Sequence, residues 1–255
     1  MTGSLVPLTD PGRTLVCLFP YAGGSASSYW SWANLFPAGI AVSAVQLPGR
    51  QDRWHEAPYT DFAALASDLA DEITGVAAGN PCVLVGHSLG AAIGYEVARE
   101  MDARRAGPAL LAVSAAPAPF VTTDCVPANQ MSDSELIEET RASGGLPAQV
   151  LDSEELLELV LEAFRADLVL ADSYQYEPAA PLSCPVSVFG GRQDPLVPEA
   201  ALSSWTDLTS NRVVIRVYDG DHFYLWGREH EVASAILSDL RSQVTSRGDE
   251  SQVTI

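Results

Sequence analysis

A serine in a glycine-flanked turn is the first candidate for chemistry in this sequence. Residues 86–90 read GHSLG, which fits the pattern G-x-S-x-G with Ser88 at its centre. The apolar run 82–85 comes directly before it and a helical pattern begins at Leu89, which gives the strand, sharp turn and helix of a nucleophile elbow. The two glycines let neighbouring backbone pack closely against the turn. We therefore expect Ser88 to be a nucleophile held in a strained backbone conformation.

A serine hydroxyl needs a base within hydrogen-bond reach, and a third group that orients the base. Of the four histidines, His87 adjoins the serine where an elbow directs its side chain elsewhere, His55 precedes the elbow, and His230 falls inside the last predicted helix. His222 lies just past the last predicted strand and downstream of the serine, as the order of elbow-type hydrolases requires. The sequence therefore favours His222 as the base.

The acidic partner is sought at the ends of the later predicted strands. Residues 115–119 (AAPAP) follow the fourth strand and hold no carboxylate, whereas residues 190–194 (GGRQD) end the fifth strand in Asp194. Asp219 and Asp221 remain alternatives, although neighbouring residues on a turn seldom point into each other's side chains. Asp194 is the predicted third member.

Acyl transfer also needs hydrogen-bond donors for the oxyanion that develops on the carbonyl. The elbow supplies the backbone N–H of Leu89. The turn after the first predicted strand, residues 19–25 (FPYAGGS), is rich in glycine, and we nominate the N–H of Ala22 as the second donor. A plain glycine turn is the alternative interpretation.

The elements that must position these residues follow an α/β order. Most of six short runs are apolar on both faces, as in strands covered on both sides by helices: residues 14–19, 40–46, 82–85, 110–114, 186–189 and 212–217. Between them the apolar spacing predicts crossover helices, one capped by Asp61 and others over residues 89–101, 198–208 and 229–243. The expected architecture is a mostly parallel central sheet with helices on both faces.

The alternation of strands and helices is interrupted between the fourth and fifth strands. No convincing strand occurs there over a stretch far longer than the usual connection. Ser132 with Glu135, and Asp152 with Glu155, have the spacing of capping boxes that open helices. We expect a single domain over residues 1–255, with a helical lid inserted at approximately residues 116–180, because an insertion at the end of a central strand lands where such sheets bind ligands. Ordinary scaffold helices are the alternative.

Composition excludes several classes of function. There are 33 acidic residues against 14 basic ones, all of them Arg, and the net charge is −19. Such a surface repels phosphate backbones, and the absence of Lys excludes Schiff-base chemistry. The four cysteines lack metal-site spacing, and neither a targeting segment nor a transmembrane run is evident. We therefore expect a cytoplasmic protein without nucleic-acid or membrane partners.

Taken together, the motifs resemble those of type II thioesterases, the free-standing α/β-hydrolases of polyketide and non-ribosomal peptide synthesis. The matching segments are residues 19–25, 47–50 (LPGR), 86–91, 190–194 and 220–223 (GDHF). The resemblance implies an α/β-hydrolase fold that needs neither metal nor organic cofactor. It also implies hydrolysis of acyl groups from the phosphopantetheine thiol of acyl or peptidyl carrier protein domains, for editing or release. Tyr21 departs from the pattern, since many members carry His there, and this concerns how the loop after the first strand is braced.

Other interpretations remain open. The same triad serves carboxylesterases and acyltransferases, and a non-catalytic carrier-binding module would retain the fold. We expect a monomer. Because carrier proteins are usually acidic, docking on this acidic chain needs local positive charge. Arg50 and Arg53, with Tyr21, are the candidate contacts for the carrier and its phosphate, and the alternative is that Arg50 braces its own loop and Arg53 is a solvated surface charge.

Overall fold

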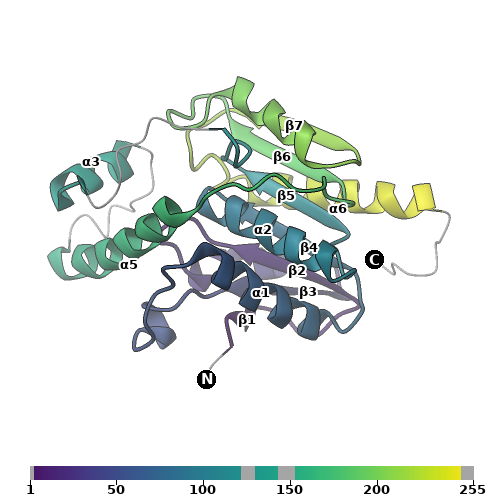
Figure 1. Ribbon diagram of the computed structural model, residues 1–255, viewed down its shortest axis with the longest axis horizontal. Helices are drawn as coiled ribbons and strands as arrows, with labels where there is room; N and C mark the ends of the chain where they lie inside the picture. The colour runs from purple at the N-terminus through teal and green to yellow at the C-terminus, as the bar shows by residue number, and fades with distance from the viewer. Residues whose placement is uncertain (1–2, 122–129, 143–152, 248–255) are drawn as a thin grey trace.

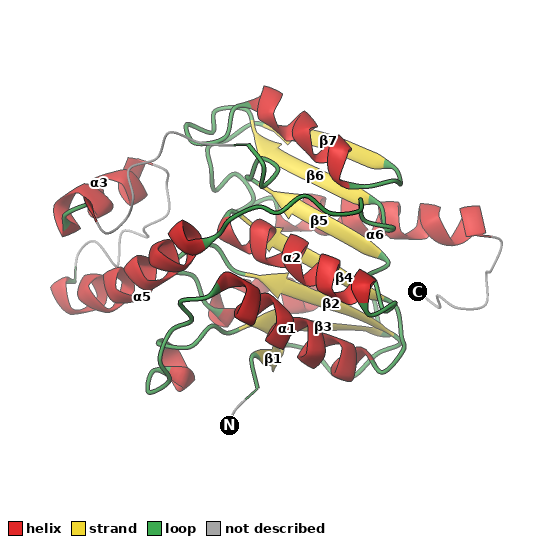
Figure 2. Cartoon of the chain, viewed as in Figure 1, coloured by secondary structure: helices red, strands yellow, loops and turns green. Residues whose placement is uncertain are grey.

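Seven strands form one sheet in the computed structural model, which describes residues 3–121, 130–142 and 153–247 (Figures 1 and 2). The strands are β1 (Leu5–Pro7), β2 (Thr14–Phe19), β3 (Ile40–Val45), β4 (Cys82–His87), β5 (Leu110–Ser114), β6 (Val186–Gly191) and β7 (Val213–Tyr218). Their spatial order is β1-β3-β2-β4-β5-β6-β7, and only β1 pairs antiparallel. The six apolar runs thus correctly predicted the parallel strands.

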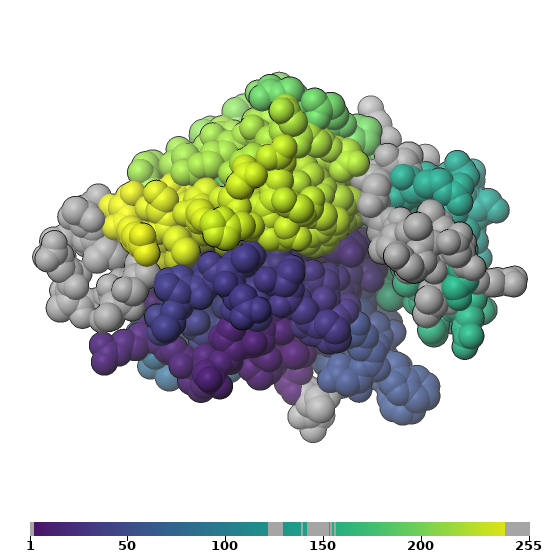
Figure 3. All heavy atoms as spheres, turned by 180° about the vertical axis from the view of Figure 1, so that it is seen from behind, coloured from purple at the N-terminus to yellow at the C-terminus, as the bar shows by residue number. Residues whose placement is uncertain are grey.

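Helices cover both faces of this sheet. One face carries α1 (Phe62–Ala77), α2 (Leu89–Ala103) and the 3₁₀ helix η4 (Glu199–Leu208), and the opposite face carries the 3₁₀ helix η1 (Ala26–Asn34) and α6 (Glu229–Arg247). Helices α1 and α2 lie toward the viewer in Figure 1, and Figure 3, seen from behind, shows α6 in yellow across the other face. The predicted α/β class is confirmed.

Alternation along the strands builds a core on each side of the sheet. Successive residues of β2 divide between them: Cys17 and Phe19 enter the core beneath α1 and α2, and Val16 and Leu18 enter the core beneath η1 and α6. A strand buried on both faces must be apolar throughout, which is why β2 reads TLVCLF. Cys17, Cys82 and Cys184 are buried, and Cys125 lies outside the described residues.

Helix α1 shows how local sequence sets an element's bounds. Asp61 has extended backbone and its side chain accepts a hydrogen bond from the N–H of Ala64 at 3.1 Å, which satisfies one of the free donors of the first turn. The buried stripe of the helix contains Leu65, Leu69 and Ile73. The predicted cap and apolar face are both confirmed.

The long connection between β5 and β6 contains helices α3 (Asp133–Ala142) and α5 (Glu154–Ser173). They lie beyond one end of the strands, at the left of Figure 1. Ser132 opens α3 as predicted: its N–H and hydroxyl donate to the Glu135 carboxylate at 2.7 Å, and the Glu135 N–H donates back at 3.3 Å. The second predicted cap, Asp152, lies outside the described residues. That this segment is a lid in a single-domain chain stays a prediction.

No helix within the described residues is long and apolar enough to cross a membrane. The cytoplasmic location expected from the sequence remains a prediction.

Candidate active site

Ser88 occupies the turn between β4 and α2 in a conformation that few residues other than glycine adopt. Its φ is 54° and its ψ is −122°, a strained region that surrounding structure must enforce. The N–H of Ser88 donates to the Ser114 carbonyl at 2.8 Å, and the Ser88 carbonyl accepts from the Ala91 N–H at 2.9 Å. These bonds fix the turn to β5 and to α2, as the predicted elbow requires.

Glycines at both ends of the elbow make this packing possible. A Cβ on Gly86 would lie 2.1 Å from the Gly90 carbonyl oxygen, and a Cβ on Gly90 would lie 2.2 Å from the carbonyl oxygen of Phe19. Both distances are too short for any side chain. Close contact between the start of α2 and the end of β2 therefore brings the elbow against the loop that follows β2.

Asp194, His222 and Ser88 form a continuous hydrogen-bonded chain. His222 Nε2 lies 3.0 Å from Ser88 Oγ, and His222 Nδ1 lies 2.9 Å from Asp194 Oδ2. The other carboxylate oxygen of Asp194 accepts from the N–H groups of Leu196 at 2.8 Å and Val197 at 3.0 Å. The turn after β6 thus holds the carboxylate, and the carboxylate orients the imidazole, as a base for Ser88 requires.

The two alternative acids lie elsewhere. Asp219 forms an exposed ion pair with Arg192 at 3.1 Å. Asp221 accepts a hydrogen bond from the N–H of Phe223 at 2.9 Å. Among the described residues it is the Asp194 carboxylate that is hydrogen-bonded to the imidazole, so the geometry favours Asp194, which was chosen for its place at the end of β6.

The two backbone N–H groups nominated as oxyanion donors belong to Leu89, which follows Ser88, and to Ala22, in the loop after β2. In the part of the chain that the structure describes, the N–H groups of Ala22 and Leu89 have no protein acceptor. The neighbouring N–H of Gly23 does have one, because it donates to Asp167 Oδ2 at 2.8 Å. Of these two adjacent amides in the loop after β2, only that of Ala22 is therefore available to a ligand.

His87 lies beside the proposed base in an aromatic pocket. Its Nδ1 is 2.9 Å from Ser114 Oγ, which is in turn 2.7 Å from the Tyr224 hydroxyl. Its ring centroid lies 5.3 Å from that of His222 and 5.3 Å from that of Phe223. Burial, together with repulsion from a charged His222, holds the pKa of His87 well below its usual range. His87 is therefore neutral, and it leaves His222 as the ring that faces the serine.

This burial predicts a pH-dependent contribution to stability. Below about pH 6.5 an unfolded chain protonates this imidazole while the folded chain keeps it neutral, so acid destabilises the fold through His87. When the pH is lowered from about 7.5 to 5.5, the free energy of unfolding of the wild type should fall by about 1 kcal/mol more than that of His87→Gln. Urea unfolding of both proteins at both pH values measures this, because other titrating groups are common to the two. Parallel pH profiles would show that His87 does not carry the effect.

Tyr21 packs within the site rather than projecting from it. Its ring meets the edges or faces of Phe223 at 4.9 Å and Trp226 at 5.8 Å between centroids. Burial raises the pKa of its phenol, an effect that the neighbouring Ser28 side chain partly offsets. Tyr21 therefore braces the loop after β2 against the segment after His222. A contact with substrate stays a prediction.

Arg50 does not present its charge to a docking partner. It is 7% exposed, and its guanidinium pairs with Asp167 of α5 and donates to the Gly24 carbonyl at 2.8 Å. The expected grip on a carrier phosphate is contradicted, because Nη1 and Nη2 are engaged inside the protein and Nε is buried. Arg50 does have a bracing role, but its side chain braces the loop after β2 and helix α5 rather than its own loop.

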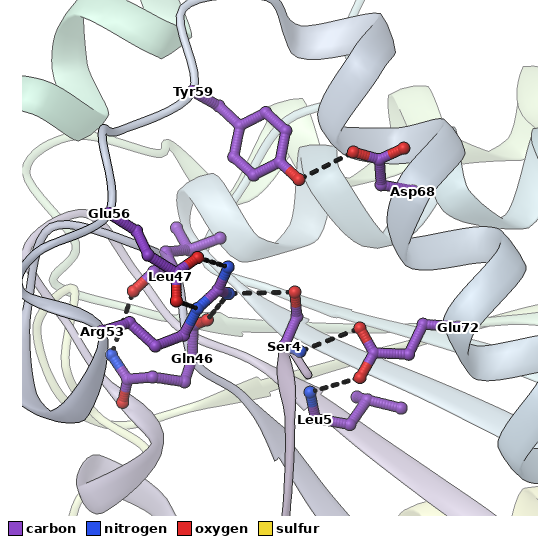
Figure 4. A network of polar contacts seen from close by, with 9 residues as sticks. All are labelled: Ser4, Leu5, Gln46, Leu47, Arg53, Glu56, Tyr59, Asp68 and Glu72. Carbon is purple, nitrogen blue, oxygen red and sulfur yellow. Dashed lines mark hydrogen bonds and ion pairs between the residues drawn. The ribbon is translucent and has the colours of Figure 1, made fainter. Parts of the chain in front are cut away.

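Arg53 is also buried, which contradicts both expectations for it (Figure 4). Its guanidinium pairs with Glu56 at 2.6 Å and donates to the Ser4 hydroxyl at 2.9 Å and the Gln46 carbonyl at 2.7 Å. It is therefore neither a docking contact nor a solvated charge. Instead it ties the turn after β3 to the start of β1, a strand the sequence did not predict.

The parallel sheet, with Ser88 after β4, Asp194 after β6 and His222 after β7, defines a hydrolase of the α/β class. A family model described as a thioesterase domain matches residues 14–243. The chain therefore belongs to the thioesterase family.

Individual relatives agree with the resemblance to type II thioesterases. The gramicidin S biosynthesis protein GrsT of Aneurinibacillus migulanus is 35% identical over 228 residues, 89% of this chain and 88% of the relative. Thioesterase PikA5 of Streptomyces venezuelae is 35% identical over 241 residues, covering 92% and 83%. The solved structure of the type II thioesterase BorB, from the borrelidin cluster, superposes with a TM-score of 0.84 at 33% identity over 92% of this chain and 97% of that one. The expected resemblance to type II thioesterases is confirmed.

Proposed function

We propose that this thioesterase hydrolyses acyl thioesters carried on the phosphopantetheine arm of acyl or peptidyl carrier protein domains, and so edits polyketide or non-ribosomal peptide synthesis. The observation that carries the proposal is the hydrogen-bonded chain Asp194–His222–Ser88. The names of relatives support the setting, since GrsT is a gramicidin S biosynthesis protein and YbtT is a type II thioesterase of the yersiniabactin pathway.

In the first half-reaction, Ser88 Oγ attacks the thioester carbonyl while His222 Nε2 accepts the hydroxyl proton. The resulting oxyanion is stabilised by the N–H groups of Leu89 and Ala22. Collapse of this intermediate breaks the carbon–sulfur bond, and His222 gives its proton to the departing sulfur. The products are the free phosphopantetheine thiol and an acyl group esterified to Ser88.

In the second half-reaction, water replaces the thiol. His222 Nε2 accepts a proton from water as the water attacks the acyl-enzyme, and then returns the proton to Ser88 Oγ as the carboxylic acid leaves. In both half-reactions, Asp194 accepts a hydrogen bond from the Nδ1–H of His222 and stabilises the imidazolium that forms. Each step uses groups of the chain, the substrate and water alone.

We propose that α3 and α5 form a lid, the inserted part of a single-domain chain. We also propose that the exposed faces of these two helices take part in carrier recognition. Leu159 and Val169 of α5 are 61% and 40% exposed, so this helix offers apolar surface to a partner. With Arg50 and Arg53 engaged internally, the carrier needs another surface. We also propose a monomer, which sedimentation velocity tests.

Three substrates with one acyl chain test the function. The purified protein is given an acyl-loaded carrier protein, the corresponding acyl-N-acetylcysteamine thioester, and the p-nitrophenyl ester. We expect kcat/KM to be greatest for the acyl-carrier protein, and the product to be the free acid. Mass spectrometry of the carrier identifies the released thiol form.

Each other outcome identifies a different function. Preference for the p-nitrophenyl ester would indicate a carboxylesterase, and acyl transfer to an added alcohol or amine in preference to water would indicate an acyltransferase. Turnover of none of the three substrates would indicate a carrier-binding module.

A further inference from the structure

One carboxylate of the inserted segment reaches the loop that holds a proposed oxyanion donor. We define the oxyanion loop as residues 20–25. Asp167 lies on α5, and its Oδ2 accepts the N–H of Gly23 at 2.8 Å. This bond joins residues 144 positions apart in the chain. A side chain from the insertion therefore fixes an amide directly next to that of Ala22.

Arg50 completes this contact from the other side. Its Nη1 donates to Asp167 Oδ2 at 2.6 Å and to the Gly24 carbonyl at 2.8 Å, and its Nη2 donates to Asp167 Oδ1 at 2.5 Å. The guanidinium thus binds the Asp167 carboxylate as a bidentate pair and also binds the Gly24 carbonyl. Bidentate pairs of this kind fix orientation as well as position.

Burial and close packing restrict the geometry of these contacts. The side chains of Arg50 and Asp167 are 7% and 4% exposed, so solvent does not compete for their hydrogen bonds. Gly23 has a φ of 75°, and a Cβ there would lie 3.1 Å from the Cβ of Phe164, one turn before Asp167 on α5. The oxyanion loop therefore packs tightly against α5 at Gly23.

Because adjacent peptide planes share a Cα, fixing the Gly23 amide and the Gly24 carbonyl limits the directions open to the Ala22 N–H. We propose that Asp167 is a positioning residue for the oxyanion loop, held in place by Arg50. The inference rests on the proposed function, in which Ala22 donates to the oxyanion. In this proposal the chemical step requires α5 to be docked, because the carboxylate that accepts the Gly23 N–H belongs to the inserted segment.

The chain offers a matched control for loss of lid contact alone. Tyr174, which directly follows α5, donates to Glu96 Oε1 of α2 at 2.6 Å, and its ring packs on Phe62 at 4.4 Å between centroids. Tyr174→Phe removes this tether but keeps the ring, and it leaves the oxyanion loop untouched. Comparison with Asp167→Ala separates loop positioning from general attachment of the helix.

The experiment measures two quantities. The first is hydrolysis of an acyl-N-acetylcysteamine thioester. The second is inhibition by the trifluoromethyl ketone with the same acyl chain, which adds to the serine and gives a tetrahedral adduct that carries an oxyanion. For Asp167→Ala we expect kcat to fall by roughly 10- to 10²-fold with KM changed by less than about threefold. The inhibition constant of the ketone should rise by the same factor as kcat/KM falls. Tyr174→Phe should leave both within about threefold of wild type.

A second variant guards against misfolding, because Asp167→Ala leaves a buried guanidinium without its partner. Replacing the pair together, Arg50→Met with Asp167→Leu, substitutes apolar groups of similar size, a change that buried ion pairs often tolerate. This double variant should melt near the wild-type temperature and yet lose kcat and ketone affinity together. Wild-type kcat in the folded double variant, a rise in KM alone, or an equal loss in Tyr174→Phe would overturn the inference.

The same data separate this inference from the proposed function. If the wild type forms no adduct with the ketone, the serine mechanism itself has failed. If the wild type binds the ketone tightly and the double variant binds it equally tightly, the mechanism stands and the positioning role of Asp167 is rejected.

Discussion

Ser88→Ala is expected to abolish covalent catalysis and to lower kcat by a factor on the order of 10⁶. The variant keeps the oxyanion donors and the substrate contacts, so residual turnover should remain at about 10³ to 10⁴ over the uncatalysed reaction. The backbone at Ser88 has a φ of 54°, and alanine meets the same steric cost as serine there. The loss should therefore report the missing hydroxyl rather than a changed fold.

Steady-state hydrolysis of the acyl-N-acetylcysteamine thioester measures this loss. Thermal melting and binding of an acyl-carrier protein are the controls, and both should match the wild type. Turnover within tenfold of wild type would remove Ser88 from the mechanism and with it the significance of the elbow.

His222→Ala is expected to lose nearly as much activity as Ser88→Ala. Without the imidazole, Ser88 Oγ loses the base that lies 3.0 Å away, and the departing thiol loses its proton donor. The double variant should be little worse than either single one, because groups that act as a unit show strongly non-additive effects. Kinetics of the two single variants and the double variant on one substrate form the complete cycle.

Multiplicative losses in this cycle would mean that Ser88 and His222 act independently.

A neighbouring imidazole provides the control. His87 is 2% exposed and its Nδ1 contacts Ser114 Oγ, whereas Ser88 Oγ is contacted by His222. His87→Gln should keep far more activity than His222→Ala, since it does not remove the base.

The parallel strands and crossover helices were predictable because a sheet covered on both faces requires apolar runs that helices separate. Strand β1 was not, since Leu5–Pro7 is only three residues long and depends on pairing with β3. The 3₁₀ helix η1 was also missed. Its buried residues Tyr29 and Trp32 do not repeat over enough turns to show a helical period.

The site residues with a local signature were the ones that sequence reasoning found. Ser88 lies in a motif, and Asp194 and His222 follow predicted strands, so parallel topology brings them to one edge. Asp167 has no such signature. Asp167 lies between Phe164 and Leu168 of α5, and nothing in its spacing indicated that it would reach the loop at Gly23.

The prediction for Arg53 was wrong, because its residue type and its position suggested an exposed side chain. Its burial depends on Ser4 and Gln46, which reach it through the unpredicted strand β1 and the end of β3. Charge in a sequence shows that a partner is needed, and only the tertiary structure shows whether that partner is inside the protein.

The covalent step at Ser88 is tested most directly by locating the adduct of a serine-reactive alkyl fluorophosphonate. The wild-type chain is labelled to completion, its intact mass is measured, and the modified residue is identified by peptide mass spectrometry. A single adduct on Ser88, formed in proportion to the loss of thioesterase activity and absent from Ser88→Ala, is the predicted result. An adduct on another residue, or full labelling of Ser88 with thioesterase activity retained, would contradict the mechanism.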